Sequence, residues 1–159
     1  MSFRIGFGYD VHQLAEGEEL NLGGIIVPHT KGSVGHSDAD VLIHVICDAI
    51  LGALSLGDIG THFPDNDPQY KGIDSKILLR DVIALMRKEG FEIGNIDSTV
   101  CLQRPKIKDT IPAMRKCLVE IMSIPLRDLS IKATTTEKLG FVGTEAGISA
   151  YAVVLVKAT

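Results

Sequence analysis

The chain has 159 residues, of which 45% are hydrophobic and 23% are charged, a mix that suits one globular domain. We therefore expect a single domain over residues 1–159 that buries its core without disulfides or metal staples. Sixteen lysines and arginines against twenty aspartates and glutamates give a net charge of −4, with no long basic run. This balance argues against nucleic acid as a partner, because surfaces that bind nucleic acid are strongly basic.

Three cysteines, Cys47, Cys101 and Cys117, lie far apart among apolar residues. An odd number without CxxC spacing indicates reduced, buried thiols rather than a disulfide framework or a metal site. The first residues, MSFRIGFGYD, lack the layout of a signal peptide, and no apolar run reaches the roughly 18 residues that a membrane span needs. We expect a cytoplasmic protein that does not bind membranes.

Residues 3–12 alternate with the period of a strand. One side would carry Phe3, Ile5, Phe7, Tyr9 and Val11, and the other Arg4, Gly6, Gly8, Asp10 and His12. A second strand over 20–28 contains Gly23-Gly24, which indicates a bulge or a close approach by another group. We predict that these two strands pair as a hairpin through the polar AEGEE loop.

Apolar residues recur at helical spacing over 38–56, 74–88 and 108–123, and these ranges are predicted helices. The first has Ser37 or Asp38 available as N-cap, and the second ends at Gly90. Strands are predicted near 96–103, 129–135 and 147–157. The order ββααβαββ predicts an α/β (α+β) fold in which helices cover a mixed sheet. Residues 58–72, DIGTHFPDNDPQYKG, fit neither period, and a loop this long in a compact domain is often functional.

Two acidic stretches, GYDVHQL and HSDADVLIH, contain three of the five histidines. Asp10 and His12 stand two apart on a strand, so their side chains leave the same face and can share one ion. Alone, this spacing more often belongs to a surface pair or a hydrogen-bonded core histidine than to a metal site. His44 adds weight to the metal interpretation, because it lies on a helical stripe with Asp40 and Asp48 beside the apolar face.

If this helix packs across the first strand, one carboxylate and two imidazoles converge. Such a set suits Zn²⁺ or another divalent transition metal, with a fourth position left for water or substrate. Asp10, His12 and His44 would then form a catalytic zinc site. His36 stands at the start of the helix, where free N–H groups and the helix dipole favour an anion, so it could bind phosphate. The simpler interpretation of His36 is a polar residue that flanks the helix.

The segment KATTTEKLGF, residues 132–141, is a second polar signal at a predicted strand end. Its hydroxyls, backbone N–H groups and Glu137 suit a diphosphate with Mg²⁺ or Mn²⁺ held mainly by phosphate oxygens. A run of threonines also fits β-propensity alone. QRPKIK, residues 103–108, fits a solvated turn or a loop in which a proline rigidifies the position of Lys106.

Taken together, these stretches resemble the 2-C-methyl-D-erythritol 2,4-cyclodiphosphate synthase family of the non-mevalonate isoprenoid pathway. The similar segments are RIGFGYDVH, GHSDADVLIH, LGDIGTHFPDNDP and VKATTTEKLGF, in the family's order and nearly end to end. The resemblance implies a homotrimer with active sites between neighbouring subunits. It implies a lyase that acts on 4-diphosphocytidyl-2-C-methyl-D-erythritol 2-phosphate, in which the 2-phosphate attacks the β-phosphorus, CMP leaves and a cyclic diphosphate forms.

The resemblance also assigns roles to individual residues. Asp10, His12 and His44 match zinc ligands, Glu137 matches the residue beside Mg²⁺, and His36 and Thr135 match positions that stabilise the transition state. Substrate contacts are implied for Ser37, Asp58, Ile59, Gly60, Phe63, Pro64, Asp65, Asn66, Asp67, Leu102, Gln103, Arg104, Pro105, Lys106, Ile107, Lys108, Thr134, Thr136, Phe141 and Thr144. Thr144 stands where family members often carry an arginine, and Arg104 where the residue is commonly small.

Two alternatives use the same residues. A zinc-dependent phosphohydrolase would activate water at the Asp-His-His site and release free phosphate. A nucleotide-binding trimeric module would hold metal and ligand without turnover. The products formed from the diphosphocytidyl substrate distinguish the three functions.

Overall fold

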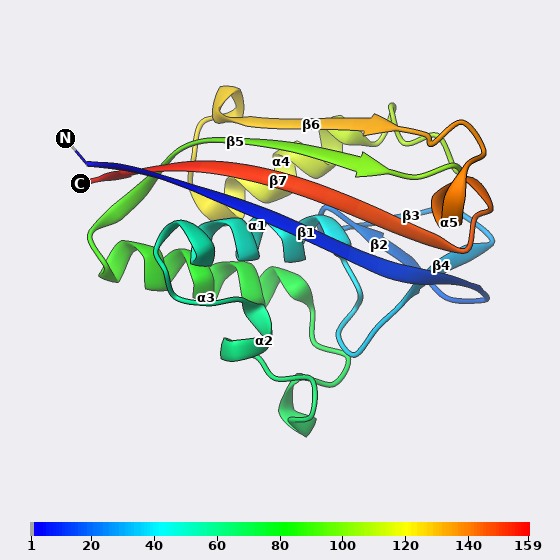
Figure 1. Ribbon diagram of the computed structural model, residues 1–159, viewed down its shortest axis with the longest axis horizontal. Helices are drawn as coiled ribbons and strands as arrows, with labels where there is room; N and C mark the ends of the chain where they lie inside the picture. The colour runs from blue at the N-terminus through cyan, green and yellow to red at the C-terminus, as the bar shows by residue number, and fades with distance from the viewer. Residues whose placement is uncertain (1) are drawn as a thin grey trace.

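The computed structural model describes residues 2–159 (Figure 1). Its elements are, in chain order, β1 (Phe3–Glu16), β2 (Leu20–Leu22), β3 (Ile25–Val27), β4 (Lys31–Val34), α1 (Val41–Ala53), α2 (Ile59–His62), η1 (Pro68–Tyr70), α3 (Ser75–Lys88), β5 (Phe91–Cys101), α4 (Ile111–Met122), η2 (Leu126–Asp128), β6 (Leu129–Thr134), α5 (Gly140–Gly143) and β7 (Gly147–Ala158). The three long predicted helices are confirmed as α1, α3 and α4, each beginning one to three residues later than expected.

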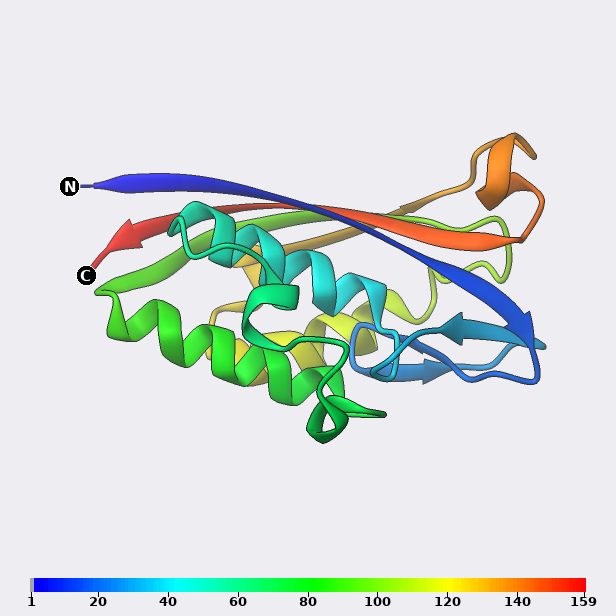
Figure 2. The same cartoon turned by 60° about the horizontal axis from the view of Figure 1, so that its bottom comes forward.

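A five-stranded sheet in the order β4-β1-β7-β5-β6 forms one layer of the molecule. The apolar strand β7 lies at its centre and pairs antiparallel with β1 and β5, while β5 and β6 run parallel. Figure 2 shows the long helices on one face of this sheet, with the other face bare. The predicted α+β fold with a mixed sheet is therefore confirmed.

The predicted pairing of residues 20–28 with the first strand is wrong. Gly23 and Gly24 have φ angles of 62° and 79°, so they form a turn that splits the segment into β2 and β3. These two short strands pair with each other in a separate sheet, and β1 pairs with β4 instead. The expected close approach by another group is present, because the N–H groups of both glycines donate to the carboxylate of Asp40.

Helix α1 is the centre of the core. Of its thirteen residues, all except Asp48 and Gly52 are buried, because the helix packs on β1 and β7 on one side and on α3 on the other. A helix that is apolar nearly all round is expected in such a position. Segment 58–72 lies beside the layer of long helices and contains only the short helical turns α2 and η1 (Figure 1).

The face of β1 that meets α1 carries glycine where a strand usually carries large apolar residues. A Cβ atom on Gly6 would lie 1.7 Å from the carbonyl oxygen of Ala49, and one on Gly8 would lie 2.1 Å from that of Val45. The backbones of β1 and α1 are thus in direct contact, which no larger residue at these positions permits. The large side chains Phe3, Ile5, Phe7, Tyr9 and Val11 point to the bare face and are 43–72% exposed.

Across residues 2–159, none of the helices has the length and hydropathy required to cross a membrane.

Replacing Gly6 with alanine should destabilise the fold, because the added methyl group forces the backbones of β1 and α1 apart. We expect the free energy of unfolding to fall by about 3 kcal/mol, the upper part of the usual range for overpacking. Gly52→Ala is the matched control, since its Cβ would meet only the Phe7 carbonyl at 4.0 Å and alanine favours a helix. Urea unfolding at equal protein concentration compares them; equal stability of the Gly6→Ala variant and the wild type would contradict the packing argument.

Candidate metal centre and active site

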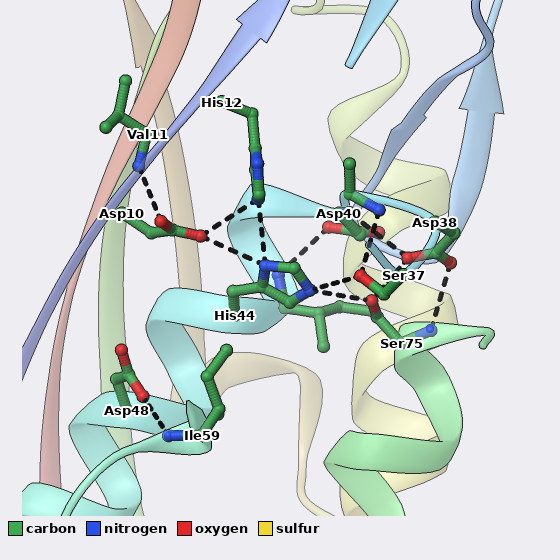
Figure 3. Close-up of polar contacts among 12 residues, drawn as sticks. Asp10, Val11, His12, Ser37, Asp38, Asp40, His44, Asp48, Ile59 and Ser75 are labelled. Carbon is green, nitrogen blue, oxygen red and sulfur yellow. Dashed lines mark hydrogen bonds and ion pairs between the residues drawn. The ribbon is translucent and has the colours of Figure 1, made fainter. Parts of the chain in front are cut away.

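Three predicted ligands converge where β1 crosses α1. Asp10 and His12 come from the helix-facing side of β1, and His44 comes from the first turn of α1 (Figure 3). Asp10 Oδ2 lies 3.1 Å from His12 Nε2 and 3.1 Å from His44 Nδ1, and the two histidine nitrogens are 3.0 Å apart. The close contact of Gly8 with Val45 produces this arrangement, because Gly8 is two residues before Asp10 and Val45 follows His44.

These distances fit a shared metal ion. Ligand atoms at 2.0–2.1 Å from a tetrahedral Zn²⁺ are separated from one another by about 3.3 Å, close to the three separations observed here. Within residues 2–159, one group of three or more His, Cys, Asp or Glu side chains has its ligand atoms close enough together to hold a single ion. That group is Asp10, His12 and His44. Three ligands from two rigid elements, beside an open cavity, correspond to the donor set of a catalytic rather than a structural zinc site.

The charge on Asp10 supports the same assignment. Partial burial alone would raise the pKa of this carboxyl group, but the contacts of Oδ2 with the His12 and His44 rings, at 3.1 Å each, outweigh burial and lower the pKa far below its usual value. Asp10 is therefore ionised and acceptor-only at neutral pH. A second hydrogen bond from the N–H of Val11 to Oδ1, at 2.8 Å, orients the carboxylate so that Oδ2 faces the histidines.

The predicted stripe of Asp40, His44 and Asp48 does not face one common ligand. Asp40 is fully buried and is the N-cap of α1, so the prediction of Ser37 or Asp38 as N-cap is wrong. Its carboxylate accepts from the N–H groups of Ile43, Gly23 and Gly24, which point away from the metal ligands. Spacing alone could not show this, because an aspartate four residues before His44 has the same spacing whether it caps the helix or binds a metal.

Asp48 holds the start of segment 58–72 against the helix. Its Oδ1 accepts from the N–H of Ile59 at 2.8 Å (Figure 3). Burial raises the pKa of Asp48, and the negative charges of Asp58 and Asp10 add to the rise, while the Ile59 hydrogen bond opposes it. Ile59 in turn lines the cavity, so Asp48 positions one wall of it.

A cavity of about 340 Å³ opens in front of the three ligands, a size suited to a small molecule. It is lined by Asp10, His12, His36, Ser37, His44, Ile59, Gly60, Phe63, Asp65, Tyr70, Ile73 and Leu78. Nine of these were predicted site residues, while Tyr70, Ile73 and Leu78 were not. Tyr70 lies within segment 58–72, which the sequence marks as a possible functional loop, and this could have identified it. Leu78 has the ordinary pattern of a core helix residue, so no sequence signal identifies it.

The remaining residues of the predicted loop surround this cavity rather than line it. Asp58 is the N-cap of α2 and accepts from Thr61, and Pro64 and Asn66 lie in the turn that follows. His36 Nε2 donates to the carbonyl oxygen of Asp67 at 3.3 Å, so this cavity residue is in direct contact with the loop.

The other predicted residues form a second group at the ends of β5 and β6. A hollow of about 150 Å³ is lined by Leu102, Gln103, Pro105, Lys106, Ile107, Lys108, Ala133, Thr134 and Thr135. Thr136 and Phe141 line a neighbouring hollow of about 180 Å³ with Tyr9 and Tyr151. Arg104, Glu137 and Thr144 are exposed. Among residues 2–159, the lining of these two hollows shares no residue with the lining of the metal-ligand cavity. One chain therefore presents two separate sets of predicted site residues.

The comparisons with known proteins support these assignments of fold and family. A family model described as "YgbB family" matches residues 3–157. The chain belongs to the YgbB family. A relative from Bacteroides fragilis, named 2-C-methyl-D-erythritol 2,4-cyclodiphosphate synthase, is 62% identical over 156 residues, 98% of each chain. The resemblance predicted from the four motifs is thus confirmed.

Two solved structures share the fold of this chain. The bifunctional IspDF protein from Campylobacter jejuni matches with a TM-score of 0.96 and 41% identity over 99% of this chain, which spans 43% of that larger protein. The IspF CDP complex from Plasmodium falciparum matches with a TM-score of 0.87 and 37% identity, over 99% of this chain and 97% of that one.

His12→Ala should abolish tight metal binding, because only two ligands remain. The fold should stay intact, because His12, at 16% side-chain exposure, is not part of the apolar core. We expect native protein to retain about one Zn²⁺ per chain after dialysis and the variant to retain almost none, as measured by elemental analysis. His29→Ala is the control, since His29 is not part of the ligand cluster. Equal zinc content in the His12→Ala variant and the control would show that the metal lies elsewhere.

Proposed function

We propose that this chain converts 4-diphosphocytidyl-2-C-methyl-D-erythritol 2-phosphate to 2-C-methyl-D-erythritol 2,4-cyclodiphosphate with release of CMP. The observation that carries the proposal is the convergence of Asp10, His12 and His44 at a cavity that also exposes His36 and Ser37, in a chain of the YgbB family. The Plasmodium falciparum relative was solved with CDP, which supports a cytidine nucleotide as part of the substrate. The free thiols of Cys47, Cys101 and Cys117 support a reducing, cytoplasmic compartment.

The reaction needs positioning and charge neutralisation rather than a protein nucleophile. An oxygen of the 2-phosphate forms a bond to the β-phosphorus, and the bond from that phosphorus to the oxygen of CMP breaks. His36 and Ser37 line the cavity beside the metal ligands and can donate hydrogen bonds to phosphate oxygens. Apolar walls from Ile59, Phe63 and Leu78 exclude water, which would otherwise compete with the 2-phosphate.

Two divalent ions are part of this proposal. Asp10, His12 and His44 would hold Zn²⁺, and Glu137 would hold Mg²⁺ or Mn²⁺ beside the diphosphate. Bound there, the ions would withdraw negative charge from phosphate oxygens on both sides of the reacting phosphorus. Glu137 suits this role because it is exposed, and its side chain lies 3.4 Å from Thr135 Oγ1. Glu137 and Lys138 both have left-handed backbone, with φ of 53° and 66°, a strain that often marks functional loops.

A homotrimer would join the two sets of predicted site residues. The bare face of the sheet carries a stripe of apolar side chains from β1 and β7, which we call the apolar face and define as Phe3, Ile5, Phe7, Tyr9, Val11, Tyr151 and Val153, each 40–72% exposed. An exposed apolar area of this kind is typical of a subunit interface. Threefold packing through it would let the metal ligands of one subunit meet Leu102–Lys108 and Thr134–Thr136 of the next.

The substrate assay decides between this function and its alternatives. Purified protein is incubated with the diphosphocytidyl substrate and Mg²⁺, and the products are separated and examined by phosphorus NMR. We expect CMP and the cyclic diphosphate in equal amounts. Inorganic phosphate with a linear product would indicate the phosphohydrolase instead, and unchanged substrate would indicate a binding module.

Glu137→Gln should lower turnover about 100-fold without changing zinc content, because it weakens one contact that stabilises charge in the transition state. Glu145→Gln is the matched control, a glutamate on the chain segment that follows α5. Turnover and bound zinc are measured on the same samples. Normal turnover in the Glu137→Gln variant, with an unchanged Mg²⁺ requirement, would remove Glu137 from the mechanism.

Subunit mixing tests whether active sites are shared. His12→Ala impairs the metal side of each site and Glu137→Gln the diphosphate side, so each homotrimer should be nearly inactive. When the two are co-expressed and assemble at random, about a quarter of the sites combine two intact halves, and activity should return to about that fraction of wild type. A mixture no more active than its parents would place each site within one chain, and sedimentation as a monomer would exclude the trimer itself.

A further inference from the structure

We propose that Ser75 and Asp38 form a hydrogen-bonded relay behind His44 that holds its ring with Nδ1 toward the metal position and Nε2–H away from it. Neither residue belongs to the predicted ligand set, and neither lines the cavity. The relay rests on the proposed metal site and assigns Ser75 and Asp38 as positioning residues within it. Figure 3 shows the chain of contacts running from Asp10 through His44 to Ser75 and Asp38.

The two ring nitrogens of His44 have different neighbours. Nδ1 faces Asp10 Oδ2 at 3.1 Å and His12 Nε2 at 3.0 Å, the two other predicted ligand atoms. Nε2 faces two hydroxyls, Ser75 Oγ at 3.0 Å and Ser37 Oγ at 3.1 Å. The ring is buried, at 5% exposure, and Ser75 is completely buried, so water does not compete for Nε2.

Counting hydrogens fixes the direction of the relay. The hydroxyl hydrogen of Ser75 is donated to Asp38 Oδ1, so Ser75 Oγ can only accept from His44. Asp38 also accepts from the N–H groups of Ser75 and Asp40, at 3.1 and 3.3 Å. The three atoms that contact Asp38 therefore all donate to its carboxyl oxygens, which act as acceptors. His44 Nε2 therefore carries a hydrogen, and the lone pair of Nδ1 is available to a metal.

Backbone pairing keeps the relay in place. The N–H of Asp38 donates to the carbonyl of Ile73 at 3.0 Å, and the N–H of Gly72 donates to the carbonyl of His36 at 2.7 Å. These two bonds attach the start of α3 to the turn before α1. In that turn Ala39 has a left-handed φ of 56°, which allows the chain to reverse between Asp38 and the N-cap.

The relay also explains how Ser37 remains available to a ligand. Ser37 Oγ accepts from the N–H of Ala39 at 3.2 Å, and His44 Nε2–H points between the two serines. The hydrogen of Ser37 is then not required by His44, and this hydroxyl lines the cavity. Ser75 thus satisfies the buried side of the ring, while Ser37 can donate to a phosphate oxygen.

Metal affinity of the purified protein tests the relay independently of activity. Zn²⁺ is titrated into metal-free protein in competition with a chromophoric chelator, for wild type, Ser75→Ala and Ser98→Ala. Ser98 is the matched control, because it is a serine of similar burial whose hydroxyl donates to a backbone carbonyl, that of Ser130, in a different part of the sheet. We expect Ser75→Ala to bind Zn²⁺ about 10- to 100-fold more weakly than wild type, the usual effect of losing such a partner, and Ser98→Ala to match wild type.

A second variant and a spectroscopic signal keep the test decisive. Asp38→Asn should also weaken Zn²⁺ binding, by a smaller factor than Ser75→Ala. If Ser75→Ala does not fold, the Zn²⁺ affinity of Asp38→Asn tests the relay instead. In zinc-loaded wild type, NMR should detect a slowly exchanging hydrogen on His44 Nε2 that exchanges rapidly in the Ser75→Ala variant. If wild type binds Zn²⁺ and both variants bind it equally well, the relay is wrong and the metal site stands. If wild type binds none, the metal site itself is wrong.

Discussion

The direct contact between the backbones of β1 and α1 is the constraint on which the rest of the structure depends. Gly6 and Gly8 remove the side chains that would otherwise separate strand and helix. The helix then lies close enough for His44 to come within 3.1 Å of Asp10 and 3.0 Å of His12. The same alternation directs the large side chains of β1 to the opposite side of the sheet, where they form the apolar face. The alternation along β1 therefore places the metal ligands on one face of the strand and the side chains of the proposed subunit interface on the other.

Three aspartates attach the surrounding segments to α1. Asp40 accepts from Gly23 and Gly24 in the turn between β2 and β3, Asp48 accepts from Ile59 at the start of α2, and Asp38 accepts from Ser75 at the start of α3. Each bond joins a carboxylate near this helix to a backbone N–H of a segment distant in sequence. The buried helix is thereby a fixed reference for the cavity wall, which suits a reaction that requires precise placement of two phosphates.

Much of this arrangement could be predicted from sequence. The strict alternation of residues 3–12 placed Asp10 and His12 on one face of a strand, and the helical period placed His44 beside the apolar face of α1. Predicting the three ligands then required only the assumption that this helix packs across the strand. The family resemblance then connected LGDIGTHFPDNDP and VKATTTEKLGF to the same function, and the family is confirmed.

What could not be predicted depends on contacts between distant segments. From sequence, Gly23 and Gly24 fit a bulge within one strand as well as a turn between two strands. The strand pairing decides for the turn, because β2 pairs with β3 and not with β1. Asp40 and Asp48 share a helical stripe with His44, yet their carboxylates serve other backbone segments, because side-chain partners are set by tertiary packing. Ser75 and Asp38 are 37 residues apart, and neither has a local pattern that indicates a contact with His44. The roles of the second group, Leu102–Lys108 and Thr134–Glu137, stay predictions of the resemblance.

The location of zinc in a crystal tests the central claim most directly, that contact between β1 and α1 builds a metal site from Asp10, His12 and His44. Crystals of the protein grown with Zn²⁺ are measured on both sides of the zinc absorption edge, and an anomalous difference map locates the ion. The account predicts one strong peak per subunit, coordinated by Asp10 Oδ2, His12 Nε2 and His44 Nδ1. A peak held by other residues, or coordination through His44 Nε2, would contradict it.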